Sequence, residues 1–167
     1  MEEMRLPVSG SSMLPMLKDH DVLVIGSVTD QRLVCGDLVV RGRYEMIAHR
    51  VLWTQDSRVY TKGDARYWID PMTEGEDIWG IVKQIDRSGT VADMEAIRWK
   101  VINRLIGFVS RIQVYLVWTE QVTGQNRGRK IWWHRFSFWV SKKVNWVILF
   151  LLASRWLYKK PLRIDEK

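Results

Sequence analysis

Short apolar runs separated by polar turns fill the first ninety residues of the chain. The runs are rich in Val, Ile and Tyr, and turn residues such as Gly-Asp interrupt them about every 10 to 15 residues. This pattern is typical of antiparallel strands with one buried face. We expect strands at Asp21–Ile25, Asp37–Arg41, Met46–Trp53, Val59–Lys62 and Ile78–Ile85. The predicted fold class is a mainly β domain over residues 1–90, a β barrel or curved sheets, ended by the turn residues Ser88-Gly89.

The spacing of apolar residues becomes helical from Ala92 to Trp118. Apolar side chains recur there at intervals of three and four residues, namely Met94, Ile97, Val101, Leu105, Phe108 and Ile112. Residues 123–130 read as a polar loop, and a second aromatic segment ends in the apolar run Val144–Ala153. We therefore expect an α-helical C-terminal region over residues 91–167. The run Val144–Ala153 is well short of the ~20 apolar residues that span a bilayer.

Charge divides the chain at nearly the same place. Residues 1–97 hold 11 Lys/Arg and 16 Asp/Glu, a net charge of −5, whereas residues 98–167 hold 15 Lys/Arg and 3 Asp/Glu, a net charge of +12. The basic part contains seven of the ten tryptophans. Tryptophan, basic charge and a short apolar run together favour association with an anionic membrane surface. Two alternatives are packing of these helices on the β domain and binding of nucleic acid, and since charge alone is a weak indication of the latter, no nucleic acid is expected.

Composition limits the other chemistry. The single cysteine, Cys35, excludes an intrachain disulfide, and without a Cys/His cluster we expect no metal and no cofactor. Cys35 lies in an apolar run and is predicted to be buried. The first residues show no basic segment followed by an apolar one, so neither a signal peptide nor an N-terminal anchor is expected there.

Four short blocks stand in a fixed order within the first seventy residues. They are Gly10-Ser11-Ser12-Met13-Leu14-Pro15, then Gly36-Asp37-Leu38-Val39-Val40, then His49-Arg50-Val51, then Thr61-Lys62-Gly63-Asp64, with Asp70 six residues later. One such block is weak, but four in order are specific. They bring serine, histidine and aspartate to a β-rich stretch, and these are the residue types that nucleophilic acyl transfer requires.

These blocks resemble those of the type I signal peptidases, in particular the endoplasmic-reticulum and archaeal branch that uses histidine as the general base. That branch reads Ser-Met-x-Pro, Gly-Asp-hydrophobic-Val-Val, His-Arg-Val and Thr-Lys-Gly-Asp, followed by a second aspartate. The resemblance covers roughly residues 5 to 90 and implies a signal-peptidase-like fold and serine endopeptidase activity on a leader or signal peptide. Substrates with small side chains near the scissile bond are implied as well.

The blocks also suggest a role for each residue. Ser12 is the candidate nucleophile, His49 the candidate base, and Asp70 the residue that orients the imidazole, as its position after Gly-Asp in the family implies. Asp64 is the rival carboxylate, with a turn-stabilising role as its alternative. Many signal peptidases have a serine two residues before the nucleophile, and here that residue is Gly10. A second oxyanion donor would then come from Ser11 or from the opposite wall.

Two other functions are compatible with these motifs. Glycine before the nucleophile is also common in self-cleaving repressor-type proteases, which are related and soluble, and those carry a scissile Ala-Gly or Cys-Gly bond ahead of the serine. No such bond precedes Ser12. A non-enzymatic membrane adaptor with the same fold is the other alternative. Lys62 and Cys35 are interpreted as structural, and His20 and His134 as surface or interface residues. The lack of an N-terminal anchor favours a protease dedicated to one precursor peptide or a small set.

Overall fold

The computed structural model describes residues 4–28, 32–42, 45–122, 139–140 and 143–153. Eight strands precede a long helix, α1 (Ile97–Val122), and residues 143–153 form a second helical segment. The strands are β1 (Met4–Pro7), β2 (Val22–Gly26), β3 (Leu38–Arg41), β4 (Ile47–Gln55), β5 (Arg58–Lys62), β6 (Thr73–Glu74), β7 (Ile78–Arg87) and β8 (Thr90–Asp93). A 3-10 turn, Gly75–Asp77, connects β6 to β7.

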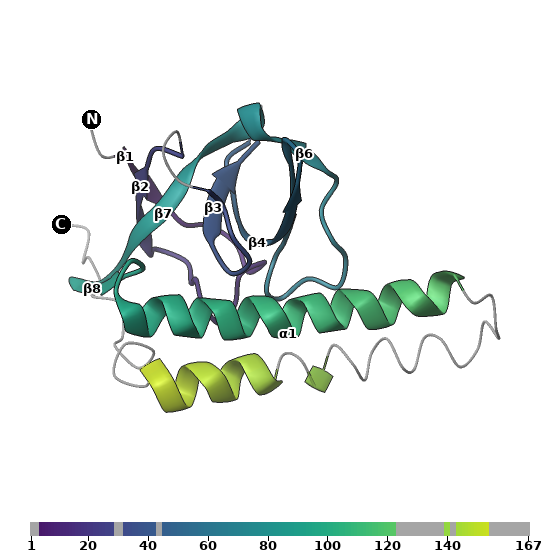
Figure 1. Ribbon diagram of the computed structural model, residues 1–167. Helices are drawn as coiled ribbons and strands as arrows, with labels where there is room; N and C mark the ends of the chain where they lie inside the picture. The colour runs from purple at the N-terminus through teal and green to yellow at the C-terminus, as the bar shows by residue number, and fades with distance from the viewer. Residues whose placement is uncertain (1–3, 29–31, 43–44, 123–138, 141–142, 154–167) are drawn as a thin grey trace.

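All eight strands belong to one antiparallel sheet that curls into a half-barrel above α1 (Figure 1). The strand order is β1-β2-β7-β3-β4-β5-β6, and β8 pairs with β7 beside this path. Long β7 therefore pairs with β2, β3 and β8. Alternate side chains of these strands point into the curl, and its interior is filled by buried aliphatic residues such as Leu23, Val40 and Ile85.

The mainly β fold with a helical region agrees with the sequence prediction. Each of the five expected strands is present, with ends that differ by no more than two residues. The strands β1, β6 and β8 were not expected, because each has only two to four residues and shows too little alternation to be recognised.

Helix α1 begins five residues later than predicted, because Ala92 belongs to β8 and is buried against the sheet. The helix packs on the sheet through Trp99, Ile102 and Ile106, which share one core cluster with Leu23 and Ile85. The helical stripe predicted from spacing faces away from this core, with the exception of Met94, which precedes the helix and is buried. Sheet and helix therefore share a core that crosses residue 90.

The second helical segment, residues 143–153, runs beside α1 (Figure 1). Its Leu149 and Ala153 are buried in the same core cluster as Ile102 and Ile106. Within the described residues, no helix is both long and apolar enough to cross a membrane. The predicted polar loop 123–130, His134 and four of the seven C-terminal tryptophans (Trp118, Trp132, Trp133 and Trp156) lie outside the residues or side chains that the structure describes.

Candidate active site

Ser12 lies in a turn-rich loop between β1 and β2. The loop is held from both sides, because the Gly10 N–H donates to Asp19 Oδ1 at 2.7 Å and the Ala65 N–H donates to the Ser12 carbonyl at 2.8 Å. Met13, next to Ser12, is buried in the core cluster. The core thus fixes one end of the turn and leaves the Ser12 hydroxyl at the wall of an open cleft.

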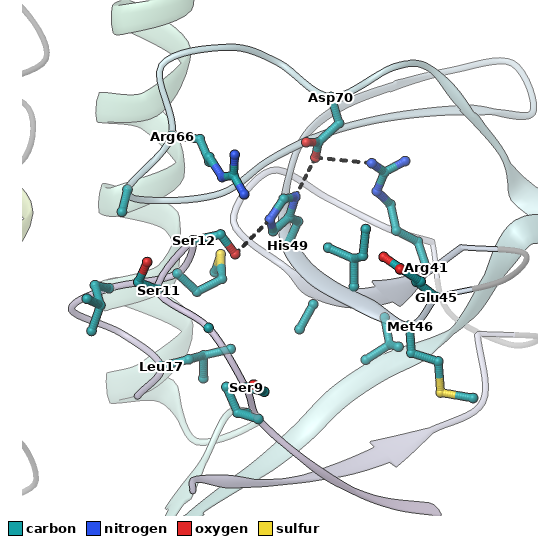
Figure 2. A pocket seen from close by; sticks show the side chains of 18 of the residues that line it. Ser9, Ser11, Ser12, Leu17, Arg41, Glu45, Met46, His49, Arg66 and Asp70 are labelled. Carbon is teal, nitrogen blue, oxygen red and sulfur yellow. Dashed lines mark hydrogen bonds and ion pairs between the residues drawn. The ribbon is translucent and has the colours of Figure 1, made fainter. Parts of the chain in front are cut away.

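The structure brings Ser12, His49 and Asp70 together in one hydrogen-bonded line (Figure 2). His49 Nε2 lies 3.1 Å from Ser12 Oγ, and His49 Nδ1 lies 2.6 Å from Asp70 Oδ2. Because a carboxylate only accepts, the Nδ1–H donates to Asp70, which leaves the Nε2 lone pair facing the Ser12 hydroxyl. This tautomer allows the imidazole to remove the serine proton.

Asp70 is itself held by two residues, Thr61 and Arg41, to which the sequence motifs assigned no catalytic role. Thr61 Oγ1 donates to Asp70 Oδ2 at 2.7 Å, and Arg41 Nη2 lies 3.5 Å from the same oxygen. Burial alone would raise the pKa of Asp70, but the hydrogen bond and charge of His49, together with Thr61 and Arg41, keep that pKa below its usual value. Asp70 is therefore a carboxylate at neutral pH. Thr61 could have been noticed as the first residue of the Thr-Lys-Gly-Asp block.

Asp64, the rival carboxylate, binds Arg50 and not His49. Arg50 Nε and Nη2 donate to its two carboxylate oxygens at 2.8 Å each, and both side chains are buried. Arg50 Nη1 also donates to the Gly36 carbonyl at 2.8 Å and to Asn103 Oδ1 at 2.9 Å. A structural role was one of the two roles expected for Asp64, but its partner is Arg50 and not the backbone of a turn. Arg50 of β4 is thus joined to Asp64, to the Gly36 loop and to α1.

Because Gly63 has no side chain, there is room beside it for Ser12 and His49 to come into contact. A Cβ atom at residue 63 would lie 2.6 Å from the Ser12 carbonyl oxygen and 2.9 Å from His49 Nε2. Real Cβ atoms do not approach that closely, so any side chain here would push apart the two groups that must stay in contact. Steric crowding thus explains why the third residue of the Thr-Lys-Gly-Asp block is glycine.

An open cleft of about 1160 Å³ runs past the Ser12 hydroxyl. One wall consists of residues 6–14, from β1 into the Ser12 loop; the others are residues 45–49 at the start of β4 and residues 65–71. Its floor is aliphatic, with Leu17, Leu23 and Val40 from the core. Figure 2 shows Arg66 and Glu45 at different sides of this cleft. Residues on both sides of Ser12 in the sequence, Ser11 and Met13 among them, line this cleft.

Lys62 is buried and does not contact Ser12 in the interactions described. Its Nζ donates to the Gly63 carbonyl at 3.2 Å, and its side chain is 1% exposed. Burial lowers the pKa of Lys62 to about 8, while Asp64 opposes this shift. The imidazole of His49, and not this amine, is the base within hydrogen-bonding distance of Ser12.

Two residues that precede the nucleophile, Gly10 and Ser11, lie at the same cleft. Ser11 is exposed and lines the cleft beside Ser12. Gly10 has φ +102°, a conformation that strongly favours glycine, which gives a physical reason for the absence of a serine there. Cys35 is half-buried, not fully buried as predicted: its Sγ faces Gly107 of α1, which covers only part of the side chain. His20 is exposed, as expected.

Among the described residues, no group of three or more His, Cys, Asp and Glu side chains could hold a metal ion. Comparison of the chain with protein-family models, with curated proteins and with solved structures finds no match.

Proposed function

We propose that the protein is a serine endopeptidase that cleaves extended peptides by a Ser12–His49–Asp70 mechanism. The observation that carries the proposal is the unbroken line from Ser12 Oγ to His49 Nε2, at 3.1 Å, and from His49 Nδ1 to Asp70 Oδ2, at 2.6 Å. These residues come from three separate segments of the chain, and a nucleophile, base and orienting carboxylate in this order are the arrangement of serine proteases on unrelated folds.

The chemistry follows from the protonation states of the three groups. Ser12 Oγ attacks the peptide carbonyl carbon while its proton passes to His49 Nε2, and Asp70 stabilises the imidazolium that forms. His49 then gives the proton to the leaving amine, and the C–N bond breaks to leave an ester on Ser12. A water molecule, deprotonated by His49, hydrolyses the ester and regenerates the Ser12 hydroxyl. The backbone N–H of Ser12 is the proposed donor to the oxyanion.

The sheet offers strand edges on which a peptide substrate can pair. β1 is the last strand of the sheet, and its residues line the cleft that leads to Ser12. On the other wall, Ile47–His49 pair with β3 but lie before the first β4–β5 pair, Arg50–Lys62. Extended peptides bind such edges through their backbone, while side-chain pockets provide specificity. The aliphatic floor of the cleft fits small apolar side chains next to the scissile bond.

The motif order and this geometry support a signal-peptidase-like catalytic domain, with a leader or signal peptide as the substrate class. A self-cleaving regulator and a non-enzymatic adaptor are the competing functions. An adaptor has no need for a serine, a histidine and a carboxylate aligned within hydrogen-bonding distance, so the alignment favours the enzyme.

The test uses the full chain and a library of extended peptides that vary in the residues flanking the scissile bond. We expect cleavage after small residues, an acyl-enzyme at Ser12 that mass spectrometry detects, and loss of at least 10³-fold in kcat for Ser12→Ala and for His49→Ala. Ser9→Ala, on the same cleft wall, is the matched control and keeps activity. Full activity in a folded Ser12→Ala variant would refute the proposal. Cleavage of the chain by itself, at a rate independent of its concentration, would favour the self-cleaving regulator.

A further inference from the structure

Helix α1 exposes a stripe of large apolar side chains on the side opposite its core contacts. The stripe consists of Ile97, Val101, Leu105, Phe108, Ile112 and Tyr115, all of them exposed. With 3.6 residues per turn these six positions fall on one narrow face, and the buried residues Trp99, Ile102 and Ile106 fall on the other. The stripe extends over about five turns, more apolar surface than a soluble helix normally leaves in water.

In the second half of α1, the inner face carries buried polar side chains while the outer face carries exposed apolar ones. Ser110 and Gln113 are buried, and so is Asn145 of the second helical segment. Their side-chain N and O atoms have no hydrogen-bond partner among the residues that the structure describes. Meanwhile Phe108 and Ile112, one or two residues away, are 59% and 44% exposed. A helix at the surface of a water-soluble protein normally has its apolar side chains inside and its polar ones outside. The reversed arrangement here suits a helix whose outer face contacts an apolar medium.

The charges beside the stripe are all of one sign. From Ile97 to Tyr115 the charged residues are Arg98, Lys100, Arg104 and Arg111, and all four are exposed. Arg98 follows one edge of the stripe on the helical wheel, and Arg104 and Arg111 follow the other. An apolar stripe between basic residues complements the acyl chains and anionic headgroups of a lipid leaflet.

Three exposed aromatic side chains lie in or just before the second helical segment. Trp139, Trp146, Val147 and Phe150 are exposed and surround a shallow hollow together with Lys143. The Lys143 ammonium lies 5.6 Å from the centre of the Trp139 ring. Tryptophan beside lysine is typical of side chains at the headgroup layer.

We propose that α1 lies along the surface of an anionic bilayer, with the stripe in the acyl region and its arginines at the phosphates. The nucleophile loop lies on the core side of this helix, because Met13 belongs to the same buried cluster as Ile102 and Ile106. A helix is about 10–12 Å thick with its side chains. Docking by the stripe therefore holds the Ser12 cleft close to the membrane surface and does not depend on a spanning helix, of which the described residues contain none. This surface is independent of the peptidase chemistry, so either proposal can fail alone.

The test is flotation of the full chain with two kinds of vesicle. One contains phosphatidylcholine alone, and the other contains about 30% phosphatidylglycerol, so that several anionic lipids lie under each bound helix. We expect binding only to the anionic vesicles, lost in high salt. The double variant Phe108→Gln/Ile112→Gln should bind at least tenfold more weakly, and Arg104→Gln about fivefold more weakly. Glutamine is a good helix former, and thermal melts check that the variants fold.

The matched control is Val91→Gln/Met72→Gln, whose side chains are 54% and 44% exposed but lie on the sheet side of the molecule. It should bind like the unmodified protein, as should Ser12→Ala. Equal binding of the Phe108/Ile112 variant would overturn the proposal. So would a concentration-dependent dimer in sedimentation that this variant abolishes while anionic vesicles bind nothing, because the stripe would then be a contact with a second copy of the chain.

Discussion

His49 and Arg50 are neighbours in β4, yet their side chains bind different carboxylates: His49 binds Asp70 at 2.6 Å and Arg50 binds Asp64 at 2.8 Å. Successive side chains of a strand point to opposite faces of the sheet. On β5, Thr61 pairs with Val51 and joins the His49 face, whereas Lys62 pairs with Arg50. The alternation of side chains along β4 and β5 thus places His49 and Thr61 beside Asp70 and places Arg50 and Lys62 in the core.

The two aspartates should respond differently to the same change. Asp70→Asn replaces an acceptor that fixes the His49 tautomer, so we expect kcat to fall by about 10³–10⁴-fold with little loss of stability. Asp64→Asn leaves the buried Arg50 without its counter-charge and should cost about 3–5 kcal/mol of unfolding free energy. Turnover and denaturant melts of both variants measure this. The opposite ranking in the two assays would show that the roles are exchanged.

Gly63→Ala should lower kcat strongly through crowding alone. Its new Cβ would lie 2.6 Å from the Ser12 carbonyl oxygen and 2.9 Å from His49 Nε2, so the Ser12–His49 contact must open. We expect kcat to fall at least 10²-fold, since small displacements of reacting groups have effects of about this size. Gly75→Ala is the control, because its Cβ meets only the Ser57 carbonyl, at 3.2 Å. Unchanged kcat in Gly63→Ala would contradict the close contact.

Lys62 predicts a pH dependence of stability. Its pKa is about 8 in the folded chain, below the ordinary value of 10.5, because burial disfavours the ammonium. Between these two pH values the unfolded chain holds a proton that the folded chain has lost, so the unfolding free energy should rise with pH across this window. The gain is on the order of 3 kcal/mol.

Lys62→Met tests this because it keeps the length of the side chain and removes the charge. The variant should be more stable than the unmodified protein at pH 7 and should lack the rise between pH 8 and 10.5 in urea unfolding. It should also retain peptidase activity, since His49 is the proposed base. Lys100→Met, on the exposed side of α1, is the control and should keep the rise. An inactive but folded Lys62→Met variant would make Lys62 part of the catalytic machinery.

Helix α1 should be necessary for the β sheet to fold. Ile106 is fully buried in the core shared with the sheet, and Leu105 next to it is exposed. We expect Ile106→Ala to cost about 2–5 kcal/mol and Leu105→Ala less than about 1 kcal/mol. A chain that ends at residue 96 should fail to give a cooperative melt. A stable, folded 1–96 fragment would show that residues 1–90 form an independent domain.

Local sequence was sufficient to predict the five main strands and the helical character of the described residues 97–122 and 143–153. Strands and helices show their buried faces as a period in the sequence. The expected grouping of Ser12 with His49 rested on the resemblance of the four blocks to a known family. Residue types alone left Asp64 and Asp70 as possible partners of the histidine, and the family resemblance favoured Asp70.

The tertiary structure decided what local sequence could not. Which aspartate reaches His49 depends on the face of β4 that each residue occupies and on the path of the loop from Gly63 to Asp70, and both are set by pairing with β5. In α1 the apolar residues surround the helix, so periodicity alone does not distinguish the buried Ile102 and Ile106 from the exposed Leu105 and Phe108. The contact with the curled sheet makes that choice, because only one face of a helix can fill a core that distant strands have shaped.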